Sequence, residues 1–204
     1  MHITRTLPAW PRAARWLVAL TVVAAVLTGV ACRGGGGEKP TPIPPQDAPI
    51  ADLPVFSESV KQGEPVPVDF TCDGADRPPH LRWGDPPAGA RSFTVIVDDP
   101  DAPRGVFAHW VVYDIPAGTR ALPPDTPRTD RLASGAAQGL NDGGTVGYRG
   151  PCPPKGDAHE YRFFVYALDA QLNLEPRAKV ADVLAAMRGH VLAVGHLSAS
   201  YQRR

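Results

Sequence analysis

Residues 93–116 read FTVIVDDPDAPRGVFAHWVVYDIP, and this stretch decides the fold because it holds two strand-like runs on either side of an acidic turn. The first run is β-branched and apolar at nearly every position, which is typical of a strand buried on both faces. It ends at Asp98 and Asp99. Pro100 and Pro103 then fix the backbone and remove donors, so the strand cannot continue through the turn.

The second run, residues 107–115, alternates between two faces as a half-buried strand does. The alternation predicts one face made of Phe107, His109, Val111 and Tyr113, and another made of Ala108, Trp110 and Val112. It therefore predicts a histidine inside a core-like strand, close to the acidic turn. We interpret this turn as one wall of the functional site.

The rest of the chain predicts a mainly β domain with a late helix. The predicted strands are 66–71, 81–83, 92–97, 107–115, 160–168 and 190–201, separated by clusters of Pro, Gly and Asp. A helix is predicted over 178–188, because apolar residues recur there at helical spacing and Gly189 follows. The long segment 120–159 is rich in Gly, Pro, Asp and Asn, which is typical of a functional or disordered loop.

The N-terminus has the pattern of an export signal. In residues 1–31, three arginines precede an uncharged apolar run that is shorter than the roughly 20 residues of a membrane span. LTGVAC resembles a bacterial lipoprotein box, in which Cys32 is acylated, although Gly29 stands where such boxes usually carry an aliphatic residue. We expect a membrane-anchored lipoprotein facing the periplasm or the cell exterior. The alternative is cleavage after Ala31 and a soluble secreted protein.

Residues 32–49 follow the signal and contain four consecutive glycines and a proline-rich segment, so we expect a disordered tether before a domain over 50–204. The whole chain has 21 basic and 21 acidic residues. Removal of the signal takes away three arginines and no acid, which leaves 18 basic against 21 acidic residues and a net charge of −3. This balance provides no basic stripe for nucleic acid.

Cys72 and Cys152 are the cysteines of the predicted domain. In an exported domain two cysteines most simply form a disulfide, which here would pin the long loop to the end of the first predicted strand. The alternative is a pair of unpaired thiols. A metal site is not expected, since there is no CxxC pair and no histidine at ligand spacing from either cysteine.

Four blocks of the sequence, taken together, resemble the phosphatidylethanolamine-binding protein family, and in particular its bacterial Raf-kinase-inhibitor-like branch. The blocks are FTCDGADRPPHLRWGDPPAGARSFTVIVDDPDAP, FAHWVVYDIP, AAQGLNDGGTVGYRGPCPPKGDAHEYRFFVYALD and RGHVLAVGHLSASYQR, which span residues 70–203. The resemblance implies a β-sandwich of two antiparallel sheets, with a long pocket loop and a helix before the last strand. It also implies a small, shallow pocket for phosphate or similar oxyanions.

The resemblance also implies which residues form this pocket. They would be Asp99, Asp101, His109, Gly147, Tyr148 and Gly150, with Pro100, Pro151 and Pro153 shaping the walls. His159 falls where the family often has a histidine after a proline, but Ala158 replaces that proline here. Gly143 and Gly144 stand where the branch usually has an aromatic residue, which would widen the pocket mouth.

The chemistry of these residues suits an anion or a zwitterion. Carboxylates alone repel phosphate, so Asp99 or Asp101 must either charge and orient His109 or meet an ammonium group of the ligand. His109, the Tyr148 hydroxyl and backbone amides of the glycine loop can donate to phosphate oxygens. The structural alternatives are a turn-capping role for Asp99, a core histidine at His109 and a packing aromatic at Tyr148.

Three classes of function follow. We favour an exported binding protein for a phosphate-containing head group or metabolite, such as phosphoethanolamine, without a cofactor or a metal. The alternative is an inhibitor of a protein partner, for which a peptidase suits an exported protein. A phosphoester hydrolase is disfavoured because the sequence has no GxSxG, HExxH or P-loop motif to provide a nucleophile, a metal or a phosphate cradle.

Overall fold

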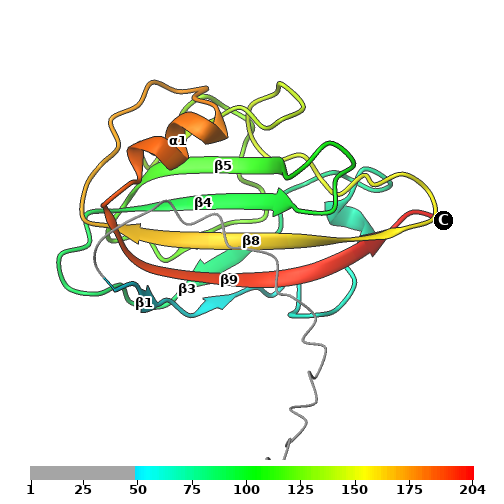
Figure 1. The fold of residues 1–204 in the computed structure, drawn as a ribbon, viewed down its shortest axis with the longest axis horizontal. Coiled ribbons are helices and arrows are strands. Elements are labelled where there is room, and N and C mark those ends of the chain that lie inside the picture. The colour runs from blue at the N-terminus through cyan, green and yellow to red at the C-terminus, as the bar shows by residue number, and fades with distance from the viewer. Residues whose placement is uncertain (1–48) are drawn as a thin grey trace, which may run out of the picture. The chain divides into compact units, whose positions relative to one another are not determined.

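The computed structural model describes residues 49–204 and is mainly β (Figure 1). The strands are β1 Ala51–Asp52, β2 Val55–Phe56, β3 Leu81–Trp83, β4 Ser92–Asp99, β5 Phe107–Pro116, β6 Ala121–Leu122, β7 Ala137–Gln138, β8 Ala158–Leu168 and β9 Val191–Gln202. The helices are the 3-10 helix η1 Val68–Phe70 and the α-helix α1 Val180–Ala186. The predicted signal peptide 1–31, Cys32 and all of the predicted tether except residue 49 lie outside the described residues.

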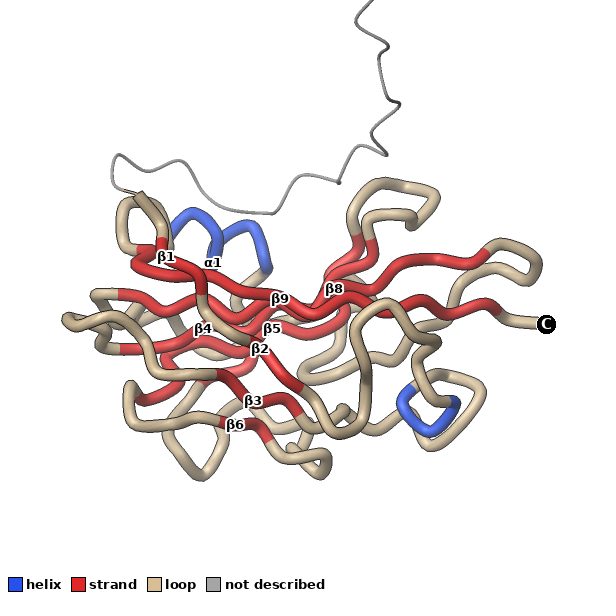
Figure 2. The backbone as a smooth tube through the Cα atoms, turned by 90° about the horizontal axis from the view of Figure 1, so that it is seen from below, coloured by secondary structure: helices blue, strands red, loops and turns tan. Residues whose placement is uncertain are grey.

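The strands form two sheets. The larger has six strands in the order β1-β9-β8-β4-β5-β7, and the smaller has three in the order β2-β3-β6 (Figure 2). All pairs are antiparallel except β1 with β9, which is parallel. The predicted two-sheet sandwich with a helix before the last strand is therefore confirmed, with one parallel edge pair that was not expected.

Apolar side chains fill both faces of the larger sheet. One cluster, which includes Trp83, Phe93 and Trp110, lies between the two sheets. A second cluster joins the other face of the larger sheet to α1 through Val183 and Met187. Because β4 and β8 lie in the middle of the sheet, both of their faces are covered, which explains the nearly continuous apolar runs in their sequences. No helix among residues 49–204 is long and apolar enough to cross a membrane.

The prediction of a strand at 66–71 is wrong. The backbone forms η1 instead, followed by a turn at residues 71–75. Pro65 and Pro67 explain the difference, because each removes a backbone donor and Pro67 fixes the residue that begins the helical turn. Only Val66 keeps a strand-like contact, as its N–H donates to the carbonyl of Ser200. The other predicted strands and the helix are confirmed with small shifts at their ends.

The alternation predicted for β5 fails at its beginning. Val97 pairs with Trp110 and Asp98 pairs with Ala108, so β5 has an extra residue, His109, opposite β4. Ala108 consequently packs in the cluster under α1, whereas Trp110 packs between the sheets. Such a bulge bends the strand and redirects the extra side chain. It brings His109 against Tyr161 of β8, with ring centroids 5.2 Å apart.

A charged pair lies within the larger sheet. The Arg162 Nε and Nη2 atoms donate to the two carboxylate oxygens of Asp98, each at 2.8 Å, and both side chains are at least 95% buried. Burial raises the pKa of Asp98, while the guanidinium opposes that shift. The two residues face each other across β4 and β8. The bidentate contact compensates two charges that are costly to remove from water.

The long segment 120–159 is ordered by polar contacts as well as by β6 and β7. The Gln138 side chain accepts from Trp110 Nε1 at 2.8 Å and donates to the carbonyls of Pro127 and Thr129. The predicted disulfide is present and joins Cys72 to Cys152, with Cα atoms 5.4 Å apart. Cross-links of this kind hold a segment with little regular structure against the rest of the domain.

We expect that replacing Cys72 and Cys152 together by serine lowers the free energy of unfolding by about 2–4 kcal/mol, because the cross-link closes a long loop in the unfolded chain. In a domain of this size the melting temperature should fall by roughly 5–15 °C. Differential scanning calorimetry measures the change, with Cys32→Ser as the control that leaves the melting temperature unchanged. A double variant that melts with the parent protein contradicts this role of the disulfide.

We expect Arg162→Met to destabilise the protein by about 3–5 kcal/mol at pH 7, because Asp98 is then buried without its counter-charge. Without Arg162, the pKa of Asp98 in the folded state rises further above its value in the unfolded chain. Asp98 therefore lowers the stability of the fold least at low pH, where it is protonated. The deficit relative to the parent should therefore shrink as the pH falls toward about 4. Urea unfolding at several pH values measures it. Arg77→Met is the matched control, because the Arg77–Asp69 pair is exposed, and a deficit as small as that of this control would refute the prediction.

Candidate functional site

The candidate site lies at the end of the larger sheet where β4 ends and β5 and β8 begin, at the right of Figure 1. A cavity of about 150 Å³ opens there. Its lining residues are Asp99, Ala102, Pro103, Phe107, His109, Arg149, Cys152, Pro153, Pro154 and His159. The charged or titratable side chains thus come from three adjacent strands and from the loop after Gly147, and an apolar wall of prolines and Phe107 surrounds them.

Asp99 is paired with a histidine, although not with the one expected. His159 Nδ1 donates to Asp99 Oδ2 at 2.7 Å, and both side chains are more than 90% buried. The other oxygen, Oδ1, accepts from the backbone N–H of Asp101 at 2.8 Å, as a turn-capping aspartate does. Asp99 therefore caps the acidic turn and orients His159 at the same time.

His109 is held by the loop instead of by a carboxylate. Its Nδ1 donates to the backbone carbonyl oxygen of Arg149 at 2.7 Å, and the Arg149 N–H donates back to the carbonyl of His109. Burial lowers the pKa of His109, against the smaller opposing effects of this hydrogen bond and of the Asp99 charge. Of the two roles considered for the carboxylates, charging His109 is therefore disfavoured, because the desolvation of the ring outweighs the neighbouring negative charge.

Tyr161 closes the inner side of the site. Its ring meets His109 edge-on, and it is fully buried. Burial first, and then the nearby Asp99 carboxylate, raise the pKa of the Tyr161 hydroxyl, so it stays protonated. The sequence analysis did not single out this residue, because a tyrosine in an apolar strand cannot be distinguished from an ordinary core residue.

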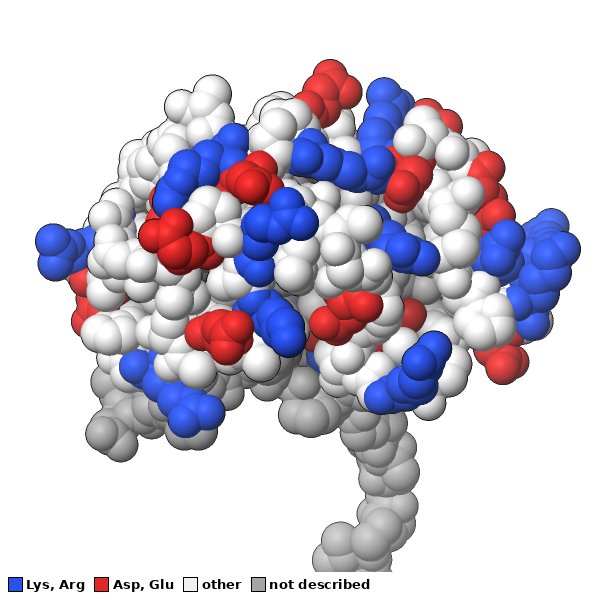
Figure 3. All heavy atoms as spheres, turned by 90° about the horizontal axis from the view of Figure 1, so that it is seen from above, with Lys and Arg blue, Asp and Glu red and all other residues white. Residues whose placement is uncertain are grey.

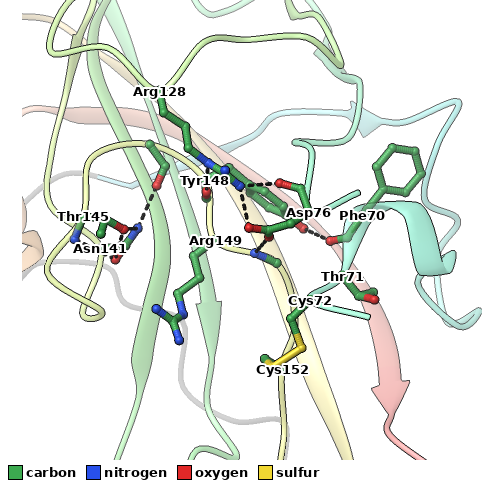
Figure 4. Close-up of polar contacts among 12 residues, drawn as sticks. Phe70, Thr71, Cys72, Asp76, Arg128, Asn141, Thr145, Tyr148, Arg149 and Cys152 are labelled. Atoms are coloured by element: carbon green, nitrogen blue, oxygen red, sulfur yellow. Dashed lines mark hydrogen bonds and ion pairs between the residues drawn. A yellow bond between two sulfur atoms is a disulfide. The ribbon is translucent and has the colours of Figure 1, made fainter. Parts of the chain in front are cut away.

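The loop that carries Arg149 is fastened to the segment after η1 (Figure 4). The Tyr148 hydroxyl donates to the carbonyl of Phe70 at 2.8 Å, and the Gly150 N–H donates to Asp76 Oδ1 at 2.6 Å. Arg128 bridges the two sides, since its Nη2 contacts Asp76 Oδ2 and its Nε contacts the carbonyl of Tyr148, each at 2.7 Å. The Cys72–Cys152 disulfide adds a covalent link. We call these contacts the loop clamp.

In the loop clamp, several predicted site residues have structural contacts in place of the ligand contacts that were expected. Tyr148 is 2% exposed and its hydroxyl is already bonded, so it is the packing aromatic of the alternative interpretation. A side chain at Gly150 would meet the carbonyl of Phe70, and one at Gly147, where φ is +85°, would meet Arg128. These glycines allow two loops to approach each other, and not a ligand. The carbonyl of Pro151 accepts from the Cys72 N–H.

Of the predicted site residues, the structure therefore brings Asp99 and His109 together at the cavity, whereas Asp101, Gly147, Tyr148, Gly150 and Pro151 do not line it. Asp101 lies just behind, where its Oδ2 accepts from the N–H of Glu160 at 3.0 Å. Pro153 is a wall residue as expected, and His159 lines the cavity in spite of Ala158.

Arg149 is the site residue that the sequence analysis missed. It lines the cavity, and in Figure 4 its side chain points away from Arg128 and Asp76. Within residues 49–204 its guanidinium forms no ion pair with a carboxylate, which leaves a fixed positive charge beside the cavity. A side chain at Gly143 would meet Arg149 Nη1 at 2.6 Å, so the glycine that departs from the family pattern makes room for this cation. The available signal was an arginine within the glycine-bounded stretch GYRG, residues 147–150.

Other hollows are less suited to a ligand. A groove of about 620 Å³ beside the end of β9 contains Asp73, but Arg203 and Tyr201 already bind this carboxylate. Among residues 49–204 there is no group of three or more His, Cys, Asp or Glu side chains placed to hold a metal ion.

Comparisons with known proteins agree with this architecture. Residues 56–202 match the family model described as phosphatidylethanolamine-binding protein. A UPF0098 protein of Aquifex aeolicus is 51% identical over 155 residues, which are 75% of this chain and 90% of the relative. The crystal structure of Escherichia coli YbcL, described as a member of the mammalian PEBP family, matches with a TM-score of 0.69 at 36% identity, over 76% of this chain and all of that one.

A second solved structure, of a phosphatidylethanolamine-binding protein homologue from Chlamydia trachomatis, matches with a TM-score of 0.68 at 34% identity. It covers 75% of this chain and 99% of that one. Family model, sequence relatives and solved structures all cover the same two-sheet domain. The chain belongs to the phosphatidylethanolamine-binding protein family.

Proposed function

We propose that this family member is an exported, lipid-anchored binding protein that captures small phosphate-containing anions or zwitterions in the cavity between Asp99, His109 and Arg149. The observation that carries the proposal is the guanidinium of Arg149, which forms no ion pair within residues 49–204 and lies beside a small cavity with two imidazoles. Arginine suits phosphate because its planar donors match the spacing of phosphate oxygens. The size of the cavity, about 150 Å³, suits a head group or a small metabolite and not a large ligand.

The carboxylate of Asp99 supports a ligand that also brings hydrogen-bond donors. Asp99 lines the cavity, and its carboxylate accepts hydrogen bonds from His159 Nδ1 and from the backbone N–H of Asp101. An ammonium group, as in phosphoethanolamine, or a protonated phosphate oxygen would be favoured next to it. The family description names phosphatidylethanolamine, which shares its ethanolamine group with the monoester phosphoethanolamine.

We propose binding without catalysis. Hydrolysis of a phosphoester needs a nucleophile or an activated water beside a general base. The residues that line the cavity include no serine or threonine, and the sulfur of Cys152 is held in the disulfide. Imidazoles fixed by Arg149 and Asp99 are suited to recognising a ligand.

We also propose that the protein faces the periplasm or the cell exterior, held to the membrane by a lipid on Cys32. The Cys72–Cys152 disulfide supports an oxidising compartment. Nucleic acid is not a proposed partner. On the face drawn in Figure 3, Lys and Arg side chains alternate with Asp and Glu, and this pattern lacks the single-sign field that attracts a polyanion.

Calorimetric titration with phosphate and phosphoethanolamine tests the proposed function. We expect saturable binding that weakens about ten- to hundredfold in Arg149→Ala, because a charged hydrogen bond is lost. Asp99→Ala and His109→Ala should weaken it as well. His190→Ala and Asp169→Ala are matched controls, because these residues form an equivalent but exposed histidine–aspartate pair. Binding that survives Arg149→Ala unchanged, or its absence in the parent protein, would refute the proposal.

Expression of the full-length chain in bacteria with a labelled fatty acid tests the membrane anchor. The parent protein should carry the label and sediment with membranes. Cys32→Ser should lose the label and appear in the soluble fraction, whereas the Cys72→Ser and Cys152→Ser double variant should keep it. A parent protein that is exported but unlabelled would show that cleavage leaves Cys32 without a lipid.

A further inference from the structure

The polar groups of the cavity are not the donors that an anion site would ordinarily present. Four polar side chains line it, namely Asp99, His109, His159 and Arg149. A carboxylate can only accept hydrogen bonds, and a guanidinium can only donate. Whether the cavity prefers a bare or a protonated oxyanion therefore depends on what His109 offers to the ligand beside the carboxylate of Asp99.

The hydrogen bond from His109 to the backbone of Arg149 determines which ring nitrogen of His109 carries the proton. A backbone carbonyl can only accept, so the contact between Nδ1 and the Arg149 oxygen at 2.7 Å places the proton on Nδ1. In a neutral ring the remaining nitrogen, Nε2, is then a hydrogen-bond acceptor. His109 can offer a donor to a ligand only by taking up a second proton.

The surroundings of His109 oppose this second proton. Asp99 of β4, His159 and Tyr161 of β8, and Asp142 and Arg149 of the long segment surround the ring. The carboxylates favour the charged ring and the guanidinium disfavours it, but burial is the largest effect and lowers the pKa of His109. The ring is therefore neutral at pH 7, and Nε2 is an acceptor.

Asp99 adds acceptors of its own. Its Oδ2 atom accepts a hydrogen bond from His159 Nδ1, and this contact orients the His159 ring. Both oxygens of Asp99 already receive one hydrogen bond and can receive another. The cavity thus combines His109 Nε2 and the Asp99 carboxylate, which are acceptors, with the guanidinium of Arg149.

A ligand that lacks a proton cannot satisfy these acceptors. A buried acceptor left without a donor costs about 1–3 kcal/mol. A site built to hydrogen-bond a hydroxyl group rejects the analogue that lacks it. A phosphate or a phosphomonoester monoanion brings both parts, a charged oxygen for Arg149 and a P–OH for the acceptors. Sulfate and a phosphodiester bring only the charged oxygens.

We propose that this cavity selects protonated oxyanions, so that it takes phosphate and phosphomonoesters through their P–OH group and discriminates against sulfate and phosphodiesters. The inference rests on the proposed function, since it concerns the ligand class of the same site. The P–OH group can come from free phosphate or from a monoesterified head group. An ammonium group is the other possible source of a donor, and the probes below distinguish it.

Calorimetry on the full-length protein in a neutral detergent tests the inference. At pH 6 we expect phosphate and methyl phosphate to bind, and sulfate and dimethyl phosphate to bind about ten- to hundredfold more weakly. From pH 6 to pH 8 the affinity for methyl phosphate should fall about tenfold or more, because its second pKa is near 6 and the dianion has no proton. Inorganic phosphate keeps a proton over this range, so its affinity should fall less.

Two variants add a readout that a merely structural role would not change. Asp99→Asn replaces an acceptor-only group by an amide that can donate and removes its charge, so the ratio of phosphate affinity to sulfate affinity should fall toward one. Asp169→Asn makes the same replacement in the exposed pair with His190 and should keep the parent ratio. An unchanged ratio in Asp99→Asn overturns the role of Asp99 in the selection.

The other outcomes separate this inference from the proposed function. Equal binding of all four anions overturns the selection for a proton and leaves the anion site in place. Binding of none of them overturns the proposed function together with the inference. Glycerophosphoethanolamine, a diester with an ammonium group, should bind as weakly as dimethyl phosphate. If it binds as tightly as methyl phosphate, the ammonium supplies the donor and the assignment to P–OH is wrong.

Discussion

The hydrogen bond from His109 Nδ1 to the carbonyl oxygen of Arg149 determines what the cavity offers to a ligand. This hydrogen bond forms because the bulge in β5 and the loop that carries Arg149 lie next to each other. The bulge at the start of β5 redirects His109, and the loop clamp holds the chain at Arg149 at the right distance. The same loop that fixes the tautomer of His109 also carries the guanidinium of Arg149, so a single segment sets the acceptor and the cation of the cavity.

The domain supports these polar groups by placing them at the end of a well-packed sheet. Tyr161, on the inner side of the cavity, is fully buried. The charges of Asp98 and Arg162 compensate each other within the sheet through a bidentate contact. Two buried side chains at the cavity have a partner on another element: His159 on β8 pairs with Asp99 on β4, and His109 on β5 pairs with the loop. Such cross-element contacts fix the orientation of these side chains, which would limit the entropy lost if a ligand binds.

The fold could be predicted largely from the sequence, because β4, β5 and β8 are long apolar runs with clear ends, and because two cysteines in the domain left one pairing. The prediction of a strand at residues 66–71 was wrong because Pro65 and Pro67 remove backbone donors there and a helical turn begins after Pro67. The site was predicted in part. Asp99 and His109 were found, but the roles of Tyr148 and Gly150 depend on contacts with Phe70 and Asp76, which are distant in the sequence. The charge state of His109 depends on burial, which no short motif reveals.

The central claim is that His109 is neutral, with its proton on Nδ1 and a free acceptor at Nε2. Nitrogen-15 NMR of the imidazole rings at pH 7, assigned with His109→Gln, measures this directly, because protonated and unprotonated ring nitrogens resonate far apart. Our account predicts a protonated Nδ1 and an unprotonated Nε2 for His109, with the Nε2 resonance moving when phosphate is added. Two protonated nitrogens at pH 7, or a proton on Nε2 alone, would contradict it.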